Sequence, residues 1–555
     1  MNNERLEKYE TPSTPKAKPS ALQPLFFAGT LIVGMFIGTN LGDQNLLKVK
    51  TGTEQNPNKL VSLIDYIEDH YVDSVDKKKL IDDAIGSILK NLDPHSSYMA
   101  PDVLAESKEQ LEGKFEGIGV EFMIHHDSLV VVKTVPGGPS EEAGLRSGDR
   151  IVQVEGQDIS GKELTNDKAQ KLLKGKGGSE VKVAVWRRGE KESMPFTIVR
   201  GSIPIESVSA SFMVDDTTGY IKVERFAQTT YEEFYEATKA LEQQGCKKLL
   251  LDLRGNGGGL LDQATAMVEE FLPPDRLIVY TEGRHSSKEV IKSSKRGEFV
   301  DMDVVVMIDQ SSASASEIVA GALQDWDRSV TVGRRSFGKG LVQHEVELPD
   351  KSALRLTVAR YYTPTGRCIQ KPYGDSVNYN DDFHQRLVNG ELTVADSTHF
   401  SDSLKYKTPG GRTVYGGGGI MPDVFVPLDS TYLNGILGEL SYSGIIRQYS
   451  FEYVDLRRKE FAKFKNSEEF VNKFVVSDAM LSELFALAKK EGIEVNSANQ
   501  RKLNLELKNR VKAQIARNLF DDNAMYQVLL TNDKDFKQAM SVAGQYRKFA
   551  VNVKQ

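Results

Sequence analysis

The pattern of apolar and polar positions divides the middle of the chain into alternating strands and helices. Short apolar runs typical of buried strands alternate there with segments whose apolar residues recur at helical spacing. The predicted strands are 219–223, 248–253 and 304–308. The predicted helices are 229–244, 260–271 and 318–326. This βαβ order indicates an α/β core.

The regions on either side of this core follow different patterns. Residues 59–111 read as amphipathic helices, interrupted at Asp93-Pro94-His95-Ser96. Residues 113–201 contain short strands, among them 120–124 and 130–135, and two helices, the second at 165–173. Residues 431–555 are charged and mostly helical in pattern. The sequence leaves open whether this last region braces the core or mediates assembly.

The N-terminus carries a candidate membrane segment. Residues 1–20 are polar and contain three prolines, which predicts a disordered tail. No charge occurs between Lys18 and Asp43, and 25–38 is strongly apolar, which fits either a signal-peptide core or a short membrane span. Because no convincing cleavage site follows, we expect an uncleaved anchor at 21–42 and a linker at 43–57. Positive charges flank the span on both sides, so they orient it only weakly.

Composition narrows the class of protein. The chain has 39% hydrophobic and 27% charged residues, which is typical of globular domains, and its net charge of −7 argues against a nucleic-acid partner. The eight histidines show no metal-ligand spacing, and His125-His126 is expected in a solvated hairpin turn. Two cysteines are too few for a disulfide framework, although a single bridge stays open, and neither is expected to be a nucleophile. We therefore expect no metal and no other cofactor.

The stretch 309–343 carries the candidate chemistry. Ser314 follows the strand 304–308 and precedes a helix, where free N–H groups and the positive end of the helix dipole would stabilise an oxyanion. A serine needs a base, and Lys339, between two glycines, could serve if burial or a nearby positive charge kept it neutral. Gln343 lies four residues later, on the same face of an extended segment, and could orient the lysine amine.

Other interpretations of these residues compete with catalysis. The serine-rich run could be only a helix N-cap, and Gly338-Lys339-Gly340 only a turn. Residues 333–339 fit a phosphate-binding loop, but Gly340 stands where Ser or Thr would bind magnesium. The glycines at 255–259 suggest a dinucleotide loop, but Leu260 stands where Gly or Ala is required.

SASASEIVAGALQD followed by FGKGLVQ resembles the carboxyl-terminal processing proteases, the tail-specific proteases of the S41 family. The resemblance runs from about residue 58 to 430. It implies that Ser314 is the nucleophile, Lys339 the general base and Gln343 the third member of the site. It also implies an oxyanion hole built from the amide of Gly257 or Gly258 and that of Ala315.

The same resemblance implies the domain organisation. The fold class expected is α/β, with a crotonase/ClpP-like protease core at 202–430 and an inserted, β-rich PDZ domain at 113–201. A helical segment at 58–112 precedes the PDZ domain, and a helical extension at 431–555 follows the core. The helices at 58–112 either pack within the chain or form a homo-oligomer.

The PDZ-like segment contains a candidate site for substrate tails. Its loop Gly117-Ile118-Gly119-Val120 resembles the loop that binds a terminal carboxylate, since such a loop exposes backbone N–H groups that can hold an anion. The following strand would pair with the tail by strand addition. Apolar groove positions favour apolar C-termini. The alternative is a PDZ domain that acts only as a spacer.

The function expected is therefore a serine endopeptidase that recognises substrate C-termini and cleaves cell-envelope proteins through an acyl-enzyme. Its catalytic part is expected outside the cytoplasm, in the periplasm of a bacterium with two membranes, held by a single inner-membrane anchor. Two rivals remain: a catalytically silent, membrane-anchored PDZ scaffold, and a crotonase-fold enzyme acting on thioesters.

Overall fold

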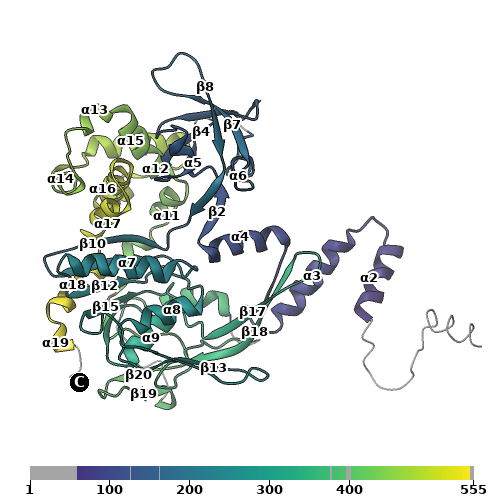
Figure 1. The fold of residues 1–555 in the computed structure, drawn as a ribbon, viewed down its shortest axis with the longest axis vertical. Helices are drawn as coiled ribbons and strands as arrows, with labels where there is room; N and C mark the ends of the chain where they lie inside the picture. Colours follow the sequence, from purple (N-terminus) through teal and green to yellow (C-terminus); the bar gives the residue numbers. More distant parts are fainter. Residues whose placement is uncertain (1–58, 126, 162, 375–377, 395–401, 550–555) are drawn as a thin grey trace, which may run out of the picture. The chain divides into compact units, whose positions relative to one another are not determined.

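The computed structural model describes residues 59–549, apart from 126, 162, 375–377 and 395–401 (Figure 1). The chain divides into two compact units, Met1–Ile81 and Asp82–Gln555. The predicted tail, the predicted span at 21–42 and the predicted linker at 43–57 all lie outside the described residues. Within the described part, none of the helices combines the length and the apolar character that crossing a bilayer requires.

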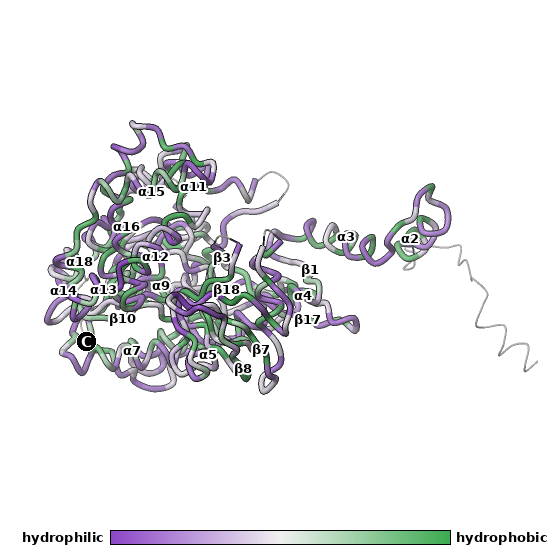
Figure 2. Tube along the Cα trace, turned by 90° about the horizontal axis from the view of Figure 1, so that it is seen from above, coloured by the Kyte–Doolittle hydropathy of each residue, from purple (hydrophilic) through white to green (hydrophobic). Residues whose placement is uncertain are grey.

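Residues 59–112 are mostly helical. The helices are α2 (Lys59–His70), α3 (Lys77–Lys90) and α4 (Pro101–Glu112). Figure 2 shows hydrophobic and hydrophilic residues alternating along α2 and α3, as the amphipathic pattern predicts. Between α3 and α4 the carboxylate of Asp93 accepts hydrogen bonds from the N–H groups of His95 and Ser96, both at 2.8 Å. This turn ends the helical run and leads into the short strand β1 (Ser97–Met99).

A six-stranded sheet forms the centre of the core. In spatial order its strands are β10 (Val208–Met213), β11 (Thr218–Val223), β12 (Lys248–Asp252), β15 (Asp303–Ile308), β16 (Ser329–Gly333) and β21 (Val424–Phe425). Only β10 pairs in the antiparallel sense; the other pairings are parallel. A parallel sheet is covered on both faces, which explains the continuous apolar runs in its strands.

Helices from distant parts of the sequence cover the two faces of this sheet. Leu249 and Leu251 of β12 pack with α7 (Thr230–Gln243), α8 (Leu261–Glu269) and α9 (Ala315–Asp325). On the opposite face, Leu250 packs with residues of α17 (Asp522–Leu530) and α18 (Lys534–Gly544). Figure 1 shows the yellow helix α18 beside β15, and the two elements are in contact. Helices α17 and α18 therefore complete the core.

The chain also forms a second sheet, in which all strand pairings are antiparallel. Its strands are β1, β13 (Leu277–Glu282), β14 (Glu289–Lys292), β17 (Leu341–Glu347) and β18 (Ala353–Tyr362). A small hairpin joins β19 (Lys405–Lys407) and β20 (Thr413–Tyr415). The short helices of this part are η1 (Tyr379–Asp381), α10 (Asp382–Val388), η2 (Asp402–Leu404) and η3 (Ser430–Leu433).

The inserted domain is an antiparallel sheet with two helices. Its strands are β3 (Val120–His125), β4 (Ser128–Thr134), β5 (Arg150–Val154), β6 (Gln157–Asp158), β7 (Glu180–Trp186) and β8 (Met194–Val199). Its helices are α5 (Pro139–Glu142) and α6 (Asn166–Leu173). The sheet order β3-β4-β5-β7-β8 leaves β3 at an edge. Paired strands β2 (Lys114–Gly117) and β9 (Gly201–Pro204) hold the two ends of the insertion together.

The C-terminal region is helical and has a core of its own. Its remaining helices are α11 (Gly435–Tyr442), α12 (Ile445–Leu456), α13 (Arg458–Phe461), α14 (Ser467–Lys473), α15 (Asp478–Lys490), α16 (Ser497–Leu519) and α19 (Tyr546–Phe549). Helix α12 also packs against the inserted domain, where Phe451 joins Val130 and Val132 of β4 in a buried cluster.

The prediction that His125 is solvated is wrong. His125 is buried at the end of β3, and its Nε2 lies 3.2 Å from Glu452 Oε1 of α12. The sequence around His125 has a hairpin signal but carries no sign of the distant helix that covers it. The predicted fold class is confirmed: an α/β core with an inserted β-rich domain, N-terminal helices and a helical C-terminal region.

Val542→Asp is expected to destabilise the whole core. Val542 of α18 is fully buried against the sheet, so a carboxylate there would lie in an apolar environment without a partner. We expect the free energy of unfolding to fall by about 3 kcal/mol or more, measured by urea denaturation. Ser541→Asp, at the exposed neighbouring position of the same helix, is the matched control and should change stability little. Equal stabilities of the two variants would contradict the role of α18 in the core.

Candidate active site

Ser314 lies at a tight turn between β15 and α9. Its backbone has φ 54° and ψ −113°, a conformation that non-glycine residues seldom adopt and that is found where a reactive side chain must be presented. A Cβ atom added to Gly258 would lie 2.7 Å from Ser314 Cβ, so only glycine fits above the serine. The packing therefore brings the glycine loop directly against the candidate nucleophile.

Two backbone amides beside Ser314 are available to an oxyanion. Within the described residues, the N–H groups of Gly257 and Ala315 have no hydrogen-bond acceptor. Gly258 differs, because its N–H donates to Asn256 Oδ1 at 2.8 Å. Of the two glycines that the sequence left open, the geometry favours Gly257, with Ala315 as the second donor.

Lys339 lies in the loop before β17 and is largely buried. Its Nζ donates to Gln343 Oε1 at 3.2 Å, and its backbone N–H donates to Glu317 Oε2 at 2.8 Å. Burial lowers the pKa of Lys339, and the positive charge of Arg355 lowers this pKa further, while Glu317 and Asp93 act in the opposite direction. The neutral amine, which a general base requires, is therefore more accessible here than in a solvent-exposed lysine.

The three predicted catalytic residues share one cavity. Ser314, Lys339 and Gln343 line a space of about 410 Å³ together with Gly257 and Ala315. The rest of its wall is mostly apolar. The apolar lining residues are Leu111, Leu260, Leu261, Ile318, Leu341, Val342 and Tyr361. The cavity can thus hold an apolar side chain beside the serine.

The orientation of Gln343 is set by a residue that sequence reasoning did not assign. Gln343 Nε2 donates to the backbone carbonyl of His95 at 2.6 Å, and since a carbonyl only accepts, Oε1 must face Lys339. Asp93 holds this turn in place, and its Oδ1 also accepts from Thr357 Oγ1 of β18 at 3.1 Å. The turn at 93–96, which the sequence analysis treated only as an interruption between helices, thus positions Gln343.

The side chain of His95 is not a competing base. Burial and the nearby Lys339 lower its pKa to about 4. Its Nε2 lies 2.7 Å from the hydroxyl oxygen of Tyr379, so the ring has a partner away from the serine.

Glu317 joins the serine turn to the lysine loop. Its carboxylate is fully buried and accepts from the N–H groups of Ser314 (2.9 Å), Gly338 (2.7 Å) and Lys339 (2.8 Å). Burial raises the pKa of Glu317, while these hydrogen bonds and that of Ser336 oppose the rise. Glu317 therefore positions both loops from the first turn of α9.

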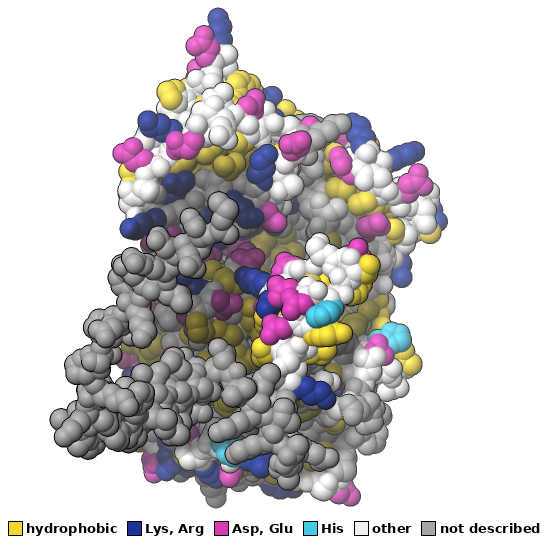
Figure 3. All heavy atoms as spheres, turned by 90° about the vertical axis from the view of Figure 1, so that its right-hand side faces the viewer, with side chains coloured by type: hydrophobic (Ala, Val, Ile, Leu, Met, Phe, Trp, Pro, Cys, Tyr) yellow, Lys and Arg dark blue, Asp and Glu magenta, His cyan; other side chains and the backbone are white. Residues whose placement is uncertain are grey.

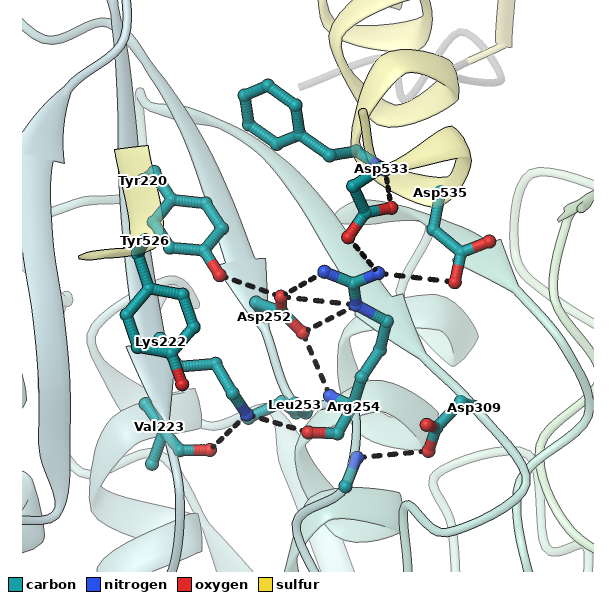
Figure 4. A network of polar contacts seen from close by, with 12 residues as sticks. Tyr220, Lys222, Val223, Asp252, Leu253, Arg254, Asp309, Tyr526, Asp533 and Asp535 are labelled. Atoms are coloured by element: carbon teal, nitrogen blue, oxygen red, sulfur yellow. Dashed lines mark hydrogen bonds and ion pairs between the residues drawn. The ribbon is translucent and has the colours of Figure 1, made fainter. Parts of the chain in front are cut away.

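The glycine loop is anchored at its start by Arg254 (Figure 4). Arg254 Nη2 donates to Asp252 Oδ2 at 2.6 Å, and Nη1 donates to Asp533 Oδ2 at 2.8 Å and to Asp535 Oδ2 at 3.2 Å. Burial opposes ionisation of Asp252, but Arg254 and Lys222 hold its pKa at about 2. Because Asp533 caps α18 and Asp535 lies in its first turn, the C-terminal extension helps to fix the loop that carries Gly257.

The predicted carboxylate loop precedes the edge strand β3. Ile118 O accepts from Ser140 N–H, and Gly119 O accepts from Val135 N–H, both at 3.0 Å. The C=O and N–H of one trans peptide point in opposite directions. The N–H of Val120 therefore points away from β4, toward the free edge of β3, and Gly117 closes the loop at the end of β2.

Neither a metal-ligand cluster nor a disulfide occurs among the described residues. No group of three His, Cys, Asp or Glu side chains among them is arranged to hold a metal ion. Cys246 and Cys368 are free thiols, and burial raises the pKa of each. On the face drawn in Figure 3, outside the grey residues, basic and acidic side chains are interspersed.

Four family models match segments of the chain. Peptidase family S41 matches residues 217–377, and a PDZ domain matches 130–187. The N-terminal domain of the activating protease CtpB matches 34–103, and a family of unknown function matches 436–521.

Similar proteins are found in several bacteria. The carboxy-terminal-processing protease of Bartonella bacilliformis is 35% identical over 348 residues, covering 61% of this chain and 79% of that protein. The carboxy-terminal processing protease CtpA of Bacillus subtilis is 34% identical over 333 residues, covering 60% and 70%.

Solved structures also match. The photosystem II D1 C-terminal processing protease is 29% identical and covers 56% of this chain and 89% of its own, with a TM-score of 0.32. The PDZ domain of a carboxy-terminal protease from Vibrio cholerae, solved in complex with a peptide, is 37% identical over 16% of this chain and 97% of its own, with a TM-score of 0.15.

The S41 and PDZ family models and the similar bacterial proteins all indicate the same family. The chain therefore belongs to the carboxy-terminal processing proteases, the PDZ-containing serine peptidases of family S41.

Proposed function

We propose that the protease works through Ser314 as nucleophile, Lys339 as general base and Gln343 as the residue that orients the lysine. The observation that carries this proposal is the shared cavity, which is lined by a strained serine and by a largely buried lysine whose amine contacts an amide of fixed orientation. A silent scaffold would have no need of a strained serine turn or of a lysine whose pKa is lowered.

The proposed reaction proceeds through an acyl-enzyme. Ser314 Oγ attacks the peptide carbonyl carbon while Lys339 Nζ takes the hydroxyl proton, and the N–H groups of Gly257 and Ala315 stabilise the oxyanion. Lys339 then gives the proton to the leaving amine. A water molecule, deprotonated in turn by Lys339, attacks the ester carbon and releases the acid and Ser314.

The substrate is proposed to be a protein with a free C-terminus. The N–H of Val120, together with the loop formed by Gly117, Ile118 and Gly119, can receive a terminal carboxylate, and the free edge of β3 can pair with an extended tail. The related Vibrio cholerae domain was solved with a peptide. We propose cell-envelope proteins as substrates, and an apolar residue beside the cleaved bond because of the apolar cavity wall.

The proposed location rests on residues outside the described structure. The uncharged, apolar run at 25–38 supports a single membrane anchor at 21–42 in the inner membrane, with the catalytic part outside the cytoplasm.

Ser314→Ala and Lys339→Ala should abolish turnover. We expect each variant to lose about a thousandfold or more in kcat on an unfolded protein with a free apolar C-terminus, because nucleophile and base act as a unit. Cleavage would be followed by gel and mass spectrometry, with circular dichroism as a check on folding. Substantial activity in either folded variant would refute the assignment, and turnover of an acyl-thioester in place of the protein would favour the thioester rival.

Arg355→Gln should move the acid limb of the pH profile to higher pH. Lys339 acts only when neutral, so activity rises as pH increases through its pKa, and removing the neighbouring positive charge raises that pKa toward its ordinary value. The measurement is kcat/KM against pH. Arg360→Gln removes the same charge from an exposed position of the same strand and should leave the limb in place. A shift in the opposite direction would contradict Lys339 as the base.

Amidation of the C-terminus should weaken tail binding. An amide carries no negative charge for the loop at Gly117–Val120, so we expect the Kd of a peptide with an apolar terminus to rise about tenfold or more. Fluorescence anisotropy with the Ser314→Ala protein measures this without cleavage. Equal affinity of the acid and the amide would favour the spacer alternative for the PDZ domain.

A further inference from the structure

A groove of about 500 Å³ lies where the PDZ domain meets the C-terminal helices. One wall comes from Phe122, Met123 and Ile124 of β3 and from Asn166, the first residue of α6. The other wall comes from the turn between α11 and α12 and from α16 and α17. Its residues are Ser441, Tyr442, Ser443, Gly444, Ile446, Arg447, Gln448, Arg510, Gln514 and Leu529.

The second wall is held in a fixed position against the PDZ domain. Phe451 of α12 packs into the apolar cluster with Val130 and Val132 of β4. Two polar contacts add to this packing: an ion pair between Arg517 Nη1 and Glu121 Oε1 at 2.7 Å, and a contact of 3.2 Å between Glu452 Oε1 and His125 Nε2. Apolar packing and these polar contacts together hold the two walls of the groove in fixed positions.

The groove continues the path of a tail bound to β3. A tail added to the edge of β3 in the antiparallel sense would have its carboxylate near Gly119 and Val120 and would run toward His125. Tail residues then oppose β3 residues one by one. Those about four to six positions before the terminal residue would pass Ile124 and enter the groove, beyond the part of the tail that a PDZ domain alone contacts.

The charged lining residues of the groove are all basic. They are Arg447 and Arg510, and no lining residue is acidic. Arg510 is engaged, since its Nε lies 2.6 Å from Glu506 Oε1. Arg447 has a weaker ion pair, and half of its side chain is exposed. Its partner, Glu121, lies 3.7 Å away and is closer to Arg517, at 2.7 Å. Arg447 is therefore the cation best placed to receive a charge from a ligand.

We propose that the C-terminal helices form the second half of the tail-binding site and that Arg447 selects tails with an acidic side chain about four to six positions before the C-terminus. This inference rests on the proposed binding of substrate tails by the PDZ domain. It gives the region matched by the family of unknown function a part in substrate choice.

The test uses the full-length Ser314→Ala protein and labelled twelve-residue peptides. All peptides end in the same two apolar residues, and they carry either two glutamates or two lysines at the fifth and sixth positions from the C-terminus. We expect the glutamate peptide to bind about fivefold to tenfold more tightly, measured by anisotropy. Arg447→Gln should remove most of this difference, and Arg447→Glu should reverse it.

Lys459→Glu is the matched control, because it changes the same charge at an exposed position of the following helix α13. It should keep the preference for glutamate. A preference that is absent in the starting protein, or that survives Arg447→Glu, would overturn the inference, as would an equal weakening of both peptides by Arg447→Glu.

An amidated copy of the glutamate peptide separates this inference from the proposed function. If amidation weakens binding but the glutamate preference is absent, tail capture stands and the role of Arg447 fails. If amidation has no effect, tail capture by the carboxylate loop fails, and with it the inference.

Discussion

A single buried carboxylate, that of Glu317, organises the catalytic centre. Two loops meet there, one carrying Ser314 and the other carrying Lys339. Both loops place backbone N–H groups in the protein interior. Such groups are costly to bury unless they find an acceptor. Glu317 accepts from both loops at once, so the position of Ser314 and that of Lys339 are set by the same side chain. The cost of burying this charge is offset by the number of donors around it.

The remainder of the site is built outward from this contact. Gln343 fixes the lysine amine, and the turn containing Asp93 and His95 fixes Gln343. On the other side, Arg254 holds the glycine loop against the serine. In each of these contacts one partner can only donate or only accept a hydrogen bond, so few other arrangements of these side chains are possible.

Much of this could be predicted from the sequence because it is local. Apolar runs and helical spacing placed the strands and helices of the core, and the motif around Ser314 pointed to the family that the comparisons confirm. What failed or was missed depends on contacts between distant segments. His125 was judged by its neighbours in sequence, whereas α12 buries it. The role of His95 depends on a backbone carbonyl, which no side-chain pattern reveals. Likewise, nothing in 522–544 alone indicates that this segment covers a sheet whose strands lie between residues 208 and 425.

Because α18 lies far behind Ser314 and Lys339 in the sequence, the parts of the site are synthesised at different times. A polypeptide leaves the ribosome from its N-terminus, so Ser314 and Lys339 emerge long before α18. Until α18 arrives, one face of the sheet is bare, and Arg254 lacks two of its three carboxylate partners. The loop that carries Gly257 is thus completed by residues that are made long after it. A chain still in synthesis therefore holds Ser314 without these surroundings, and the contacts of Arg254 are completed only after α18 has been made.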